Sequence, residues 1–235
     1  MECNSNAFKR KGSMDNRMTT TNIRFIAGVN VAYWGDEGIE WGDCSIICDD
    51  YATKVVIEEI NSIEIIAVPY LPGYLAFREL PLVIGAAKKL THAPDLFMFD
   101  GDGYSHPRHM GIVTHASFFL NKPTIDIAKC YLKIADAEFD MPENRVGSYV
   151  DMIINKELYG RVLRTHKDFK PIFVSCGNYI DLPTATTITE ELINGKCRLP
   201  IPVRLAVLQQ REIEVSYGTR NLELVSGYEI LRHKS

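Results

Sequence analysis

Three oxygen-bearing side chains stand at positions that a folded sheet could bring together. Asn30 lies in an apolar run of strand length, Glu79 starts a helical pattern, and Asp100 directly follows four apolar residues. Mg²⁺ takes oxygen ligands and keeps several waters for substrate phosphates. Asn30, Glu79 and Asp100 are therefore candidate ligands of a Mg²⁺ site that activates water against a phosphodiester.

Two of these residues also have ordinary structural explanations. An asparagine inside a strand can mark a bulge or a buried amide hydrogen bond. A glutamate at a helix start is favoured by the helix dipole without any catalytic role. Asp100 is harder to explain in this way, because the DGDG sequence that it opens puts two glycines directly after the strand.

Basic side chains follow Asp100 at two places. His106 and His115 could carry a proton or contact a phosphate, although a lone histidine is more often a structural hydrogen-bonding group. Lys129 ends the apolar segment TIDIAK, so we expect it at the same sheet edge as Asp100. A lysine there suits contact with a scissile phosphate.

The segment Pro69–Tyr74 is a stiff aromatic turn. Its two prolines restrict the backbone, and its glycine permits close approach of another chain. With Tyr70, Leu71, Pro72 and Gly73 it is a candidate wedge between nucleic-acid bases. The alternative is an ordinary proline-stiffened turn whose tyrosines pack on the core.

The elements that must position these residues have a mixed pattern. Strand-length apolar runs cover residues 23–34, 44–49 and 54–66, with a turn-rich loop over 35–43, and predict an antiparallel meander. Helical spacing over 78–90 predicts a helix. We therefore expect the chain to cross back over the sheet through this helix.

Helices and strands alternate in the second half. Strands are predicted over 96–99, 123–129 and 170–177, with a hairpin region before the last. A short helix is predicted over 187–195, and a proline begins the final helix. The pattern predicts an α/β fold whose mixed sheet carries helices on both faces.

Length and composition indicate one globular domain over residues 23–235, with a disordered polar segment over 1–22. The net charge of −4 excludes an overall basic nucleic-acid binder but not a local basic face. Six scattered cysteines indicate reduced thiols rather than a zinc site. Without a membrane-length apolar run or a signal sequence, we expect a cytoplasmic monomer with no membrane contact.

The chain resembles the endonuclease V family, metal-dependent nucleases of deaminated-purine repair with a ribonuclease H-like fold. The matching segments cover most of residues 25–205: GVNVAY, VPYLPGYLAFRE, DLFMFDGDGYSHPRHMGIVTH, PTIDIAK, PIFVSCGNYID and RLPIPVR.

The resemblance implies a role for each candidate residue. Glu79 and Asp100 match the metal carboxylates, Lys129 the active-site lysine, and His106 the histidine near the scissile phosphate. Tyr70 matches the tyrosine that fills the gap left by an extruded base. The positions that line the base pocket match Gly73, Gly101, Gly103, Gly111 and Ala128.

Three departures from the family pattern affect the predicted activity. Asn30 stands where the family has aspartate, and Asn178 stands where it has histidine. The acid of the final helix is missing, since Ile201 and Val207 occupy that region. Either the chain is a weakened or repurposed member, or Asn30 is an introduced substitution. Nearby acids could compensate: Asp36, Asp43, Asp102 and Asp126.

Two functions are consistent with these residues. In the first, Mg²⁺ or Mn²⁺ activates water to cut DNA or RNA near a deaminated base such as hypoxanthine, leaving a 3′-hydroxyl and a 5′-phosphate, as the resemblance implies. In the second, the chain is a catalytically inactive nucleic-acid-binding protein that keeps the wedge and the pocket. The sequence does not choose between DNA and RNA.

Overall fold

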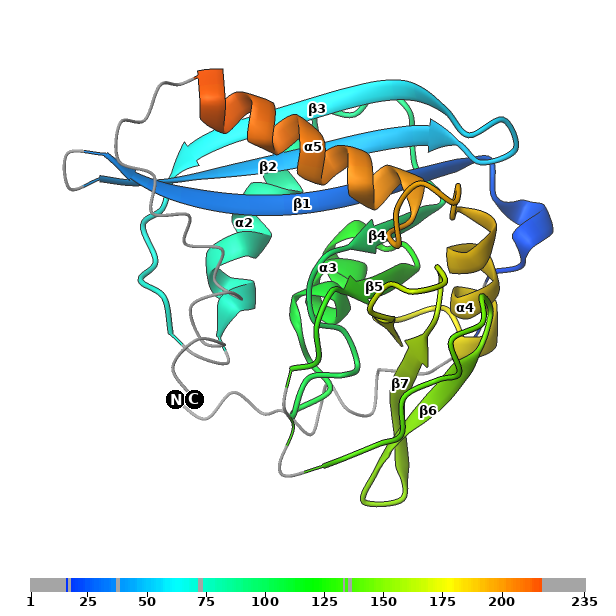
Figure 1. The fold of residues 1–235 in the computed structure, drawn as a ribbon. Helices are drawn as coiled ribbons and strands as arrows, with labels where there is room; N and C mark the ends of the chain where they lie inside the picture. The colour runs from blue at the N-terminus through cyan, green and yellow to red at the C-terminus, as the bar shows by residue number, and fades with distance from the viewer. Residues whose placement is uncertain are drawn as a thin grey trace.

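The computed structural model describes residues 16 and 18–216, except 37–38, 72–73, 133 and 135–136. In this part of the chain, eight strands form one sheet in the order β3-β2-β1-β4-β5-β8-β7-β6 (Figure 1). The strands are β1 Phe25–Asp36, β2 Ile39–Asp50, β3 Val55–Ile65, β4 Leu96–Phe99, β5 Thr124–Ala128, β6 Tyr149–Ile154, β7 Glu157–Leu163 and β8 Ile172–Cys176. The helices are η1 Thr20–Asn22, α2 Leu75–Ala87, α3 Ile112–Leu120, α4 Leu182–Glu191 and α5 Ile201–Ser216.

Strands β1, β2 and β3 form the predicted antiparallel meander. The predicted loop over 35–43 is wrong for most of its length, because Gly35 and Asp36 end β1 and residues 39–43 begin β2. Trp34 pairs with Trp41 across this hairpin. Aromatic cross-strand pairs favour strand pairing, which extends both strands through the glycine-rich sequence.

Strands β4 and β5 lie parallel to β1 and are short and wholly buried. The Asp95 carboxylate accepts hydrogen bonds from the backbone N–H groups of Arg24 (2.9 Å) and Phe25 (3.1 Å), which joins the start of β4 to the start of β1. Strand β8 runs antiparallel to β5, because the β6–β7 hairpin and not a helix connects them.

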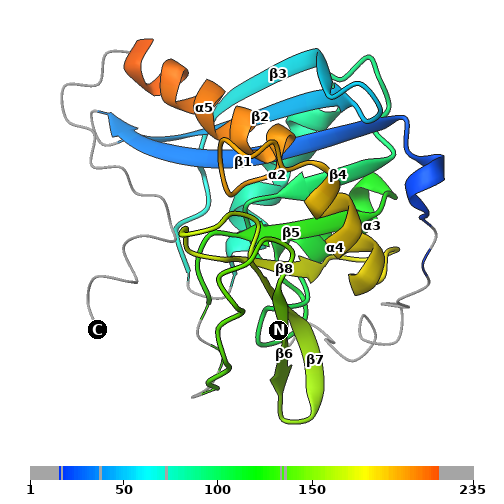
Figure 2. The same ribbon diagram turned by 45° about the vertical axis from the view of Figure 1, so that its right-hand side comes forward.

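Helices cover both faces of the sheet, as predicted (Figures 1 and 2). On one face, α2 and α3 pack against alternate residues of β1 and β4, including Val29 and Phe99. On the other face, α4 and α5 cover the remaining set, including Ile26 and Met98. The period-two alternation of each strand therefore assigns its side chains to one of two cores.

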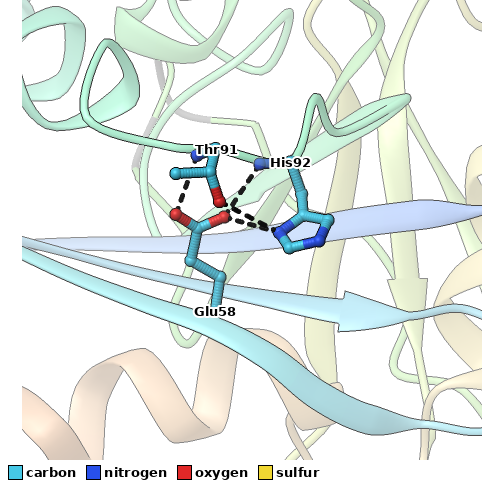
Figure 3. Close-up of polar contacts among 3 residues, drawn as sticks. All are labelled: Glu58, Thr91 and His92. Atoms are coloured by element: carbon cyan, nitrogen blue, oxygen red, sulfur yellow. Dashed lines mark hydrogen bonds and ion pairs between the residues drawn. The ribbon is translucent and has the colours of Figure 1, made fainter.

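Helix α2 begins earlier than predicted, at Leu75 instead of residue 78. Glu79 consequently lies in the second turn, where the dipole of the helix start acts on it weakly. The chain after α2 is attached to β3 by Glu58, whose carboxylate accepts hydrogen bonds from the N–H groups of Thr91 (2.8 Å) and His92 (2.9 Å), as Figure 3 shows. Although burial opposes the shift, these bonds lower the pKa of Glu58 to about 2.

Helix α5 begins beside a proline, as predicted, and crosses β1 at very close range. A Cβ atom added to Gly28 would lie 2.1 Å from the carbonyl carbon of Pro202. Only glycine allows this approach. Helix α4 begins at Leu182 and ends at Glu191, earlier than the predicted 187–195, because Asp181 caps its first turn through the Thr184 N–H (2.8 Å).

The predicted disorder over residues 1–22 extends too far toward the core. Residues 20–22 form η1, Met18 is buried, and the Asn16 amide donates a hydrogen bond to Asp181 (2.7 Å). Residues 1–15 and 17 lie outside the described part of the chain. None of the helices in the described ranges is long and apolar enough to cross a membrane. The five cysteines in these ranges are free thiols.

Asp49 in β2 is fully buried, and neither carboxyl oxygen has a hydrogen-bond partner among the described residues. Burial, with a smaller contribution from Glu59, raises the pKa of Asp49 to about 7. The folded protein thus holds a proton that the unfolded chain releases above about pH 4.

We expect the free energy of unfolding to fall as the pH rises from about 4 to 7, by up to about 1.4 kcal/mol per pH unit from Asp49. Asp49→Asn removes this contribution. Urea unfolding should show that the free energy of unfolding falls more between pH 5 and pH 8 in the wild type than in Asp49→Asn. Equal losses would contradict the assigned protonation of Asp49.

Candidate active site

The sheet opens where β4 ends. Phe99, the last residue of β4, pairs with Val29 of β1, and the Asp100 N–H donates to the Val29 carbonyl (3.4 Å). Asn30 is therefore the first residue of β1 beyond its paired segment with β4. The prediction that Asp100 lies at the mouth of a buried strand is consistent with this arrangement.

Asn30 faces α5, on the same side of β1 as Gly28. Its side-chain amide donates a short hydrogen bond to the buried Gln210 of α5. Val207 lies one helical turn before Gln210. Two neutral amides therefore join β1 to the final helix near the region where the family pattern contains carboxylates.

Glu79 of α2 is buried on the opposite face of the sheet. Burial, together with the Asp102 and Asp100 carboxylates, raises the pKa of Glu79 to about 8. The Tyr33 hydroxyl and the Arg78 guanidinium act against this shift. Tyr33 and Arg78 thus offset the cost of ionising Glu79 only in part, and Glu79 lies within the field of two other acids.

Asp100 forms an ion pair with Lys129, whose ammonium nitrogen lies 2.5 Å from a carboxylate oxygen. Lys129 directly follows β5, and its carbonyl accepts a hydrogen bond from Arg198 (3.1 Å). The expectation that Asp100 and Lys129 emerge at one sheet edge agrees with this contact. Both side chains are partly exposed and can reach a bound molecule.

The glycine-rich loop after Asp100 is packed tightly. Gly101, Gly103, Gly111 and Ala128 are all buried. A Cβ on Gly103 would lie 2.6 Å from the Cys176 carbonyl oxygen, and one on Gly111 would lie 2.0 Å from the Asp102 carbonyl oxygen. The loop is thus held against β5, β8 and the start of α3 without room for side chains at these glycines.

His106 is buried in the same loop, and its Nδ1 accepts a hydrogen bond from the Arg108 N–H (3.2 Å). Burial, followed by the positive charge of Arg108, lowers the pKa of His106 to about 4. His106 is therefore neutral at pH 7. The pKa of His115 is also lowered, first by burial.

The candidate wedge carries exposed aromatic side chains. Tyr70 is 39% exposed and Leu71 is 54% exposed, whereas Pro72 and Gly73 lie outside the described residues. Burial raises the pKa of Tyr70, and the Asp102 and Glu79 carboxylates raise it further, so this tyrosine lies near the acids. The predicted alternative, tyrosines packed on the core, does not describe Tyr70.

Asn178 lies away from these groups. Its carbonyl accepts a hydrogen bond from the Thr124 N–H (3.3 Å) at the start of β5, whereas Lys129 follows the end of that strand. Its buried amide nitrogen has no hydrogen-bond partner in the described part of the chain. The departure at Asn178 therefore lies one strand length from the Asp100–Lys129 pair.

Sequence reasoning missed the neighbours that determine the environment of the acids. Tyr33 and Arg78 affect Glu79, and Gln210 binds Asn30. Arg78 had a visible signal in the sequence FRE, where a cation directly precedes the candidate glutamate, and the structure shows that this cation is buried. Asp126 was named only as a nearby acid, although a single carboxylate within the apolar strand TIDIA indicates a buried polar contact.

The donor set fits a divalent cation held by two carboxyls. No three His, Cys, Asp or Glu side chains among residues placed by the structure form a group that could hold one ion. Mg²⁺, however, is often bound by one or two carboxylates, with water and substrate phosphates completing its shell. A cation would also offset the cost of ionising the buried Glu79. Glu79 and Asp100 stay predicted donors, and Asn30 stays a predicted third ligand, although its side chain faces α5, on the other face of the sheet from Glu79.

Comparisons with known proteins agree with the sequence resemblance. A family model described as endonuclease V matches residues 6–208. The endonuclease V of Bacillus thuringiensis subsp. konkukian is 58% identical over 200 residues, which cover 85% of each chain.

Solved structures share the fold. The crystal structure of the Bacillus subtilis endonuclease V has a TM-score of 0.88 and 53% identity, over 91% of this chain and 90% of the other. An endonuclease V from Ciona intestinalis, in complex with a 24-mer DNA containing an inosine followed by a ribo-adenosine, has a TM-score of 0.76 and 22% identity, over 91% and 95%. The expected α/β nuclease fold is confirmed.

The two-carboxyl arrangement predicts the effect of Asn30→Asp. The new carboxylate adds an anionic oxygen at the open sheet edge, and Gln210 can rotate its amide to donate to it. We expect Mn²⁺ to bind at least about tenfold more tightly, as measured by titration calorimetry without nucleic acid. Glu79→Gln should weaken binding. An unchanged affinity in Asn30→Asp would mean that residue 30 does not face the ion.

Proposed function

The chain belongs to the endonuclease V family and is an endonuclease, and we propose that it hydrolyses a phosphodiester near a deaminated purine such as hypoxanthine. The proposed cofactor is Mg²⁺ or Mn²⁺, and the proposed role is repair of deaminated nucleic acid. An endonuclease V of the same fold that holds inosine-containing DNA supports this substrate class. The cytoplasmic location and the monomeric state stay predictions.

One juxtaposition supports this proposal most strongly. A buried acid with a raised pKa, Glu79, lies in the field of Asp100, which is itself paired with Lys129 at an open sheet edge. A buried acid of raised pKa beside an ion pair at a strand end marks a candidate catalytic site. When bound, the divalent ion would supply a water of lowered pKa and neutralise phosphate charge.

The other residues would contribute binding contacts. Lys129 would direct its ammonium at the phosphate, and Asp100 would keep that side chain in place. His106 is neutral at pH 7, because its pKa is about 4, and with its Nδ1 accepting from the Arg108 N–H its Nε2–H can donate to a phosphate oxygen. Tyr70, exposed and close to the acids, can stack on a neighbouring base.

A second function is favoured by the contacts of Asn30. Its side-chain nitrogen donates to Gln210, an amide offers a metal less charge than a carboxylate, and Val207 offers no side-chain oxygen one turn away. A protein with these contacts would bind deaminated nucleic acid and cut it weakly or not at all. Binding and cleavage must therefore be measured separately.

The cleavage test uses synthetic strands with one hypoxanthine, as DNA and as RNA, with Mg²⁺ and with Mn²⁺. We expect nicking with 3′-hydroxyl and 5′-phosphate ends, and a rate at least about 100-fold lower in Asp100→Asn, or about 2.7 kcal/mol of barrier. Glu143→Gln is the control, because it removes a carboxylate that is 79% exposed. Binding without nicking under all conditions would establish the second function.

Tyr70→Ala tests recognition independently of cleavage. The substitution removes a stacking contact typically worth about 1–3 kcal/mol, so affinity for the hypoxanthine strand should fall roughly ten- to a hundredfold. Affinity for undamaged duplex should fall much less, because phosphate contacts dominate there. Tyr149→Ala, which removes a 50% exposed tyrosine on β6, is the matched control. Equal losses on both strands in Tyr70→Ala would identify Tyr70 as a packing residue.

A further inference from the structure

A buried acid outside the candidate active site binds the glycine-rich loop that follows Asp100. Asp126 is fully buried in β5 and faces α3, on the same side as Ala128. One carboxyl oxygen accepts hydrogen bonds from the Gly103 N–H (3.2 Å) and from the Ser105 hydroxyl (3.0 Å). Asp126 therefore connects the loop to the centre of the sheet.

Ser175 of β8 completes this contact. Its hydroxyl donates to the same Asp126 oxygen (2.8 Å) and lies 3.3 Å from the Ser105 backbone nitrogen, which donates to it. Ser175 and Ser105 also lie within hydrogen-bond distance of each other, at 3.1 Å between their hydroxyl oxygens. Gly103, Ser105 and Ser175 all donate to one oxygen of Asp126. Ser175 of β8 also accepts from the Ser105 N–H, so side chains of β5 and β8 hold the loop together.

Strand β5 holds the same loop at two places. Lys129, directly after the strand, pairs with Asp100 at the start of the loop, and Asp126 binds the loop three to five residues later. The loop has little freedom to move between these points, because Gly103 already lies against the Cys176 carbonyl. The position of the loop therefore depends on Asp126 of β5 and on Lys129 directly after this strand.

Asp126 acts as a hydrogen-bond acceptor and not as a counterion. Burial raises its pKa well above the usual range, and the Asp102 carboxylate adds to this shift. Its second oxygen has no hydrogen-bond partner in the part of the chain that the structure describes. An amide of the same shape can therefore accept the same three hydrogen bonds.

We propose that Asp126 is a positioning residue for base selection: by holding Gly103 and Ser105, it fixes the loop that would line the predicted pocket for an extruded deaminated base. This inference rests on the proposed function, since the pocket has this role only if the chain recognises such a base.

The test compares Asp126→Asn, Asp126→Ala and Ser105→Ala with the wild type. Binding to duplexes with and without one hypoxanthine is measured in EDTA at one salt concentration. We expect Asp126→Asn to keep the wild-type preference within about threefold, because its carbonyl accepts the same bonds. Asp126→Ala should lose roughly ten- to a hundredfold of the preference, because the three hydrogen bonds to the Asp126 oxygen are removed. Ser105→Ala should show a smaller loss.

Asp49→Ala is the matched control for deleting a buried acid. Asp49 lies in β2, which is separated from β5 by β1 and β4. The preference of the Asp49→Ala variant for hypoxanthine should therefore equal that of the wild type. A wild-type preference in Asp126→Ala, or a loss in Asp126→Asn as large as in Asp126→Ala, would overturn the proposal. If Asp126→Ala does not fold, the other two variants test the proposal. A retained preference in Asp126→Asn with a reduced preference in Ser105→Ala would support it, and a wild-type preference in Ser105→Ala would overturn it.

Amide hydrogen exchange separates this proposal from the proposed function. In the free protein, the peptide containing Gly103 and Ser105 should exchange at least about tenfold faster in Asp126→Ala or Ser105→Ala than in Asp126→Asn. If the wild-type protein shows no preference for hypoxanthine, the proposed function is contradicted, and the exchange rates alone then test whether Asp126 positions the loop. Equal exchange rates in all variants would overturn this positioning role.

Discussion

The site depends on the end of strand β4, where parallel pairing with β1 stops at Phe99. Because β4 has only four residues between longer neighbours, the chain leaves the sheet there while β1 continues beside β2. Asp100 emerges at this opening, which is the usual position of functional side chains in sheets with parallel strands. The glycine loop, the lysine after β5 and the glutamate of α2 can approach one another only because β4 ends early.

The sequence predicted the features that depend on local pattern. Buried strands, the position of Asp100 after LFMF, and helices on both faces follow from periodicity and burial, and the fold is confirmed. The extended β1–β2 hairpin and the early start of α2 were missed, because tertiary pairing overrode the local turn signals. The contacts of Asn30 with Gln210 were also inaccessible, since the two residues lie 180 positions apart.

Several acids near the site are costly to the folded protein. Glu79, Asp102 and Asp126 are all buried, and the pKa values of Glu79 and Asp126 are raised. Functional sites commonly retain such unfavourable charge at the expense of stability. An amide at position 30 avoids adding another carboxylate to this group, so the residue that is predicted to weaken cation binding would also relieve repulsion in the cation-free protein.

The amide pair between β1 and α5 also affects how the final helix is attached. The helix docks mainly through the close approach at Gly28, the buried Val203 and Ala206, and the uncharged Asn30–Gln210 contact, while Gln209 also donates to the Glu59 carboxylate. Ionic screening has little effect on uncharged contacts, whereas it strongly weakens contacts with nucleic-acid phosphates. The docking of α5 consequently depends little on ionic strength, and the slope of binding against salt reports chiefly the phosphates engaged and not a loosening of the helix.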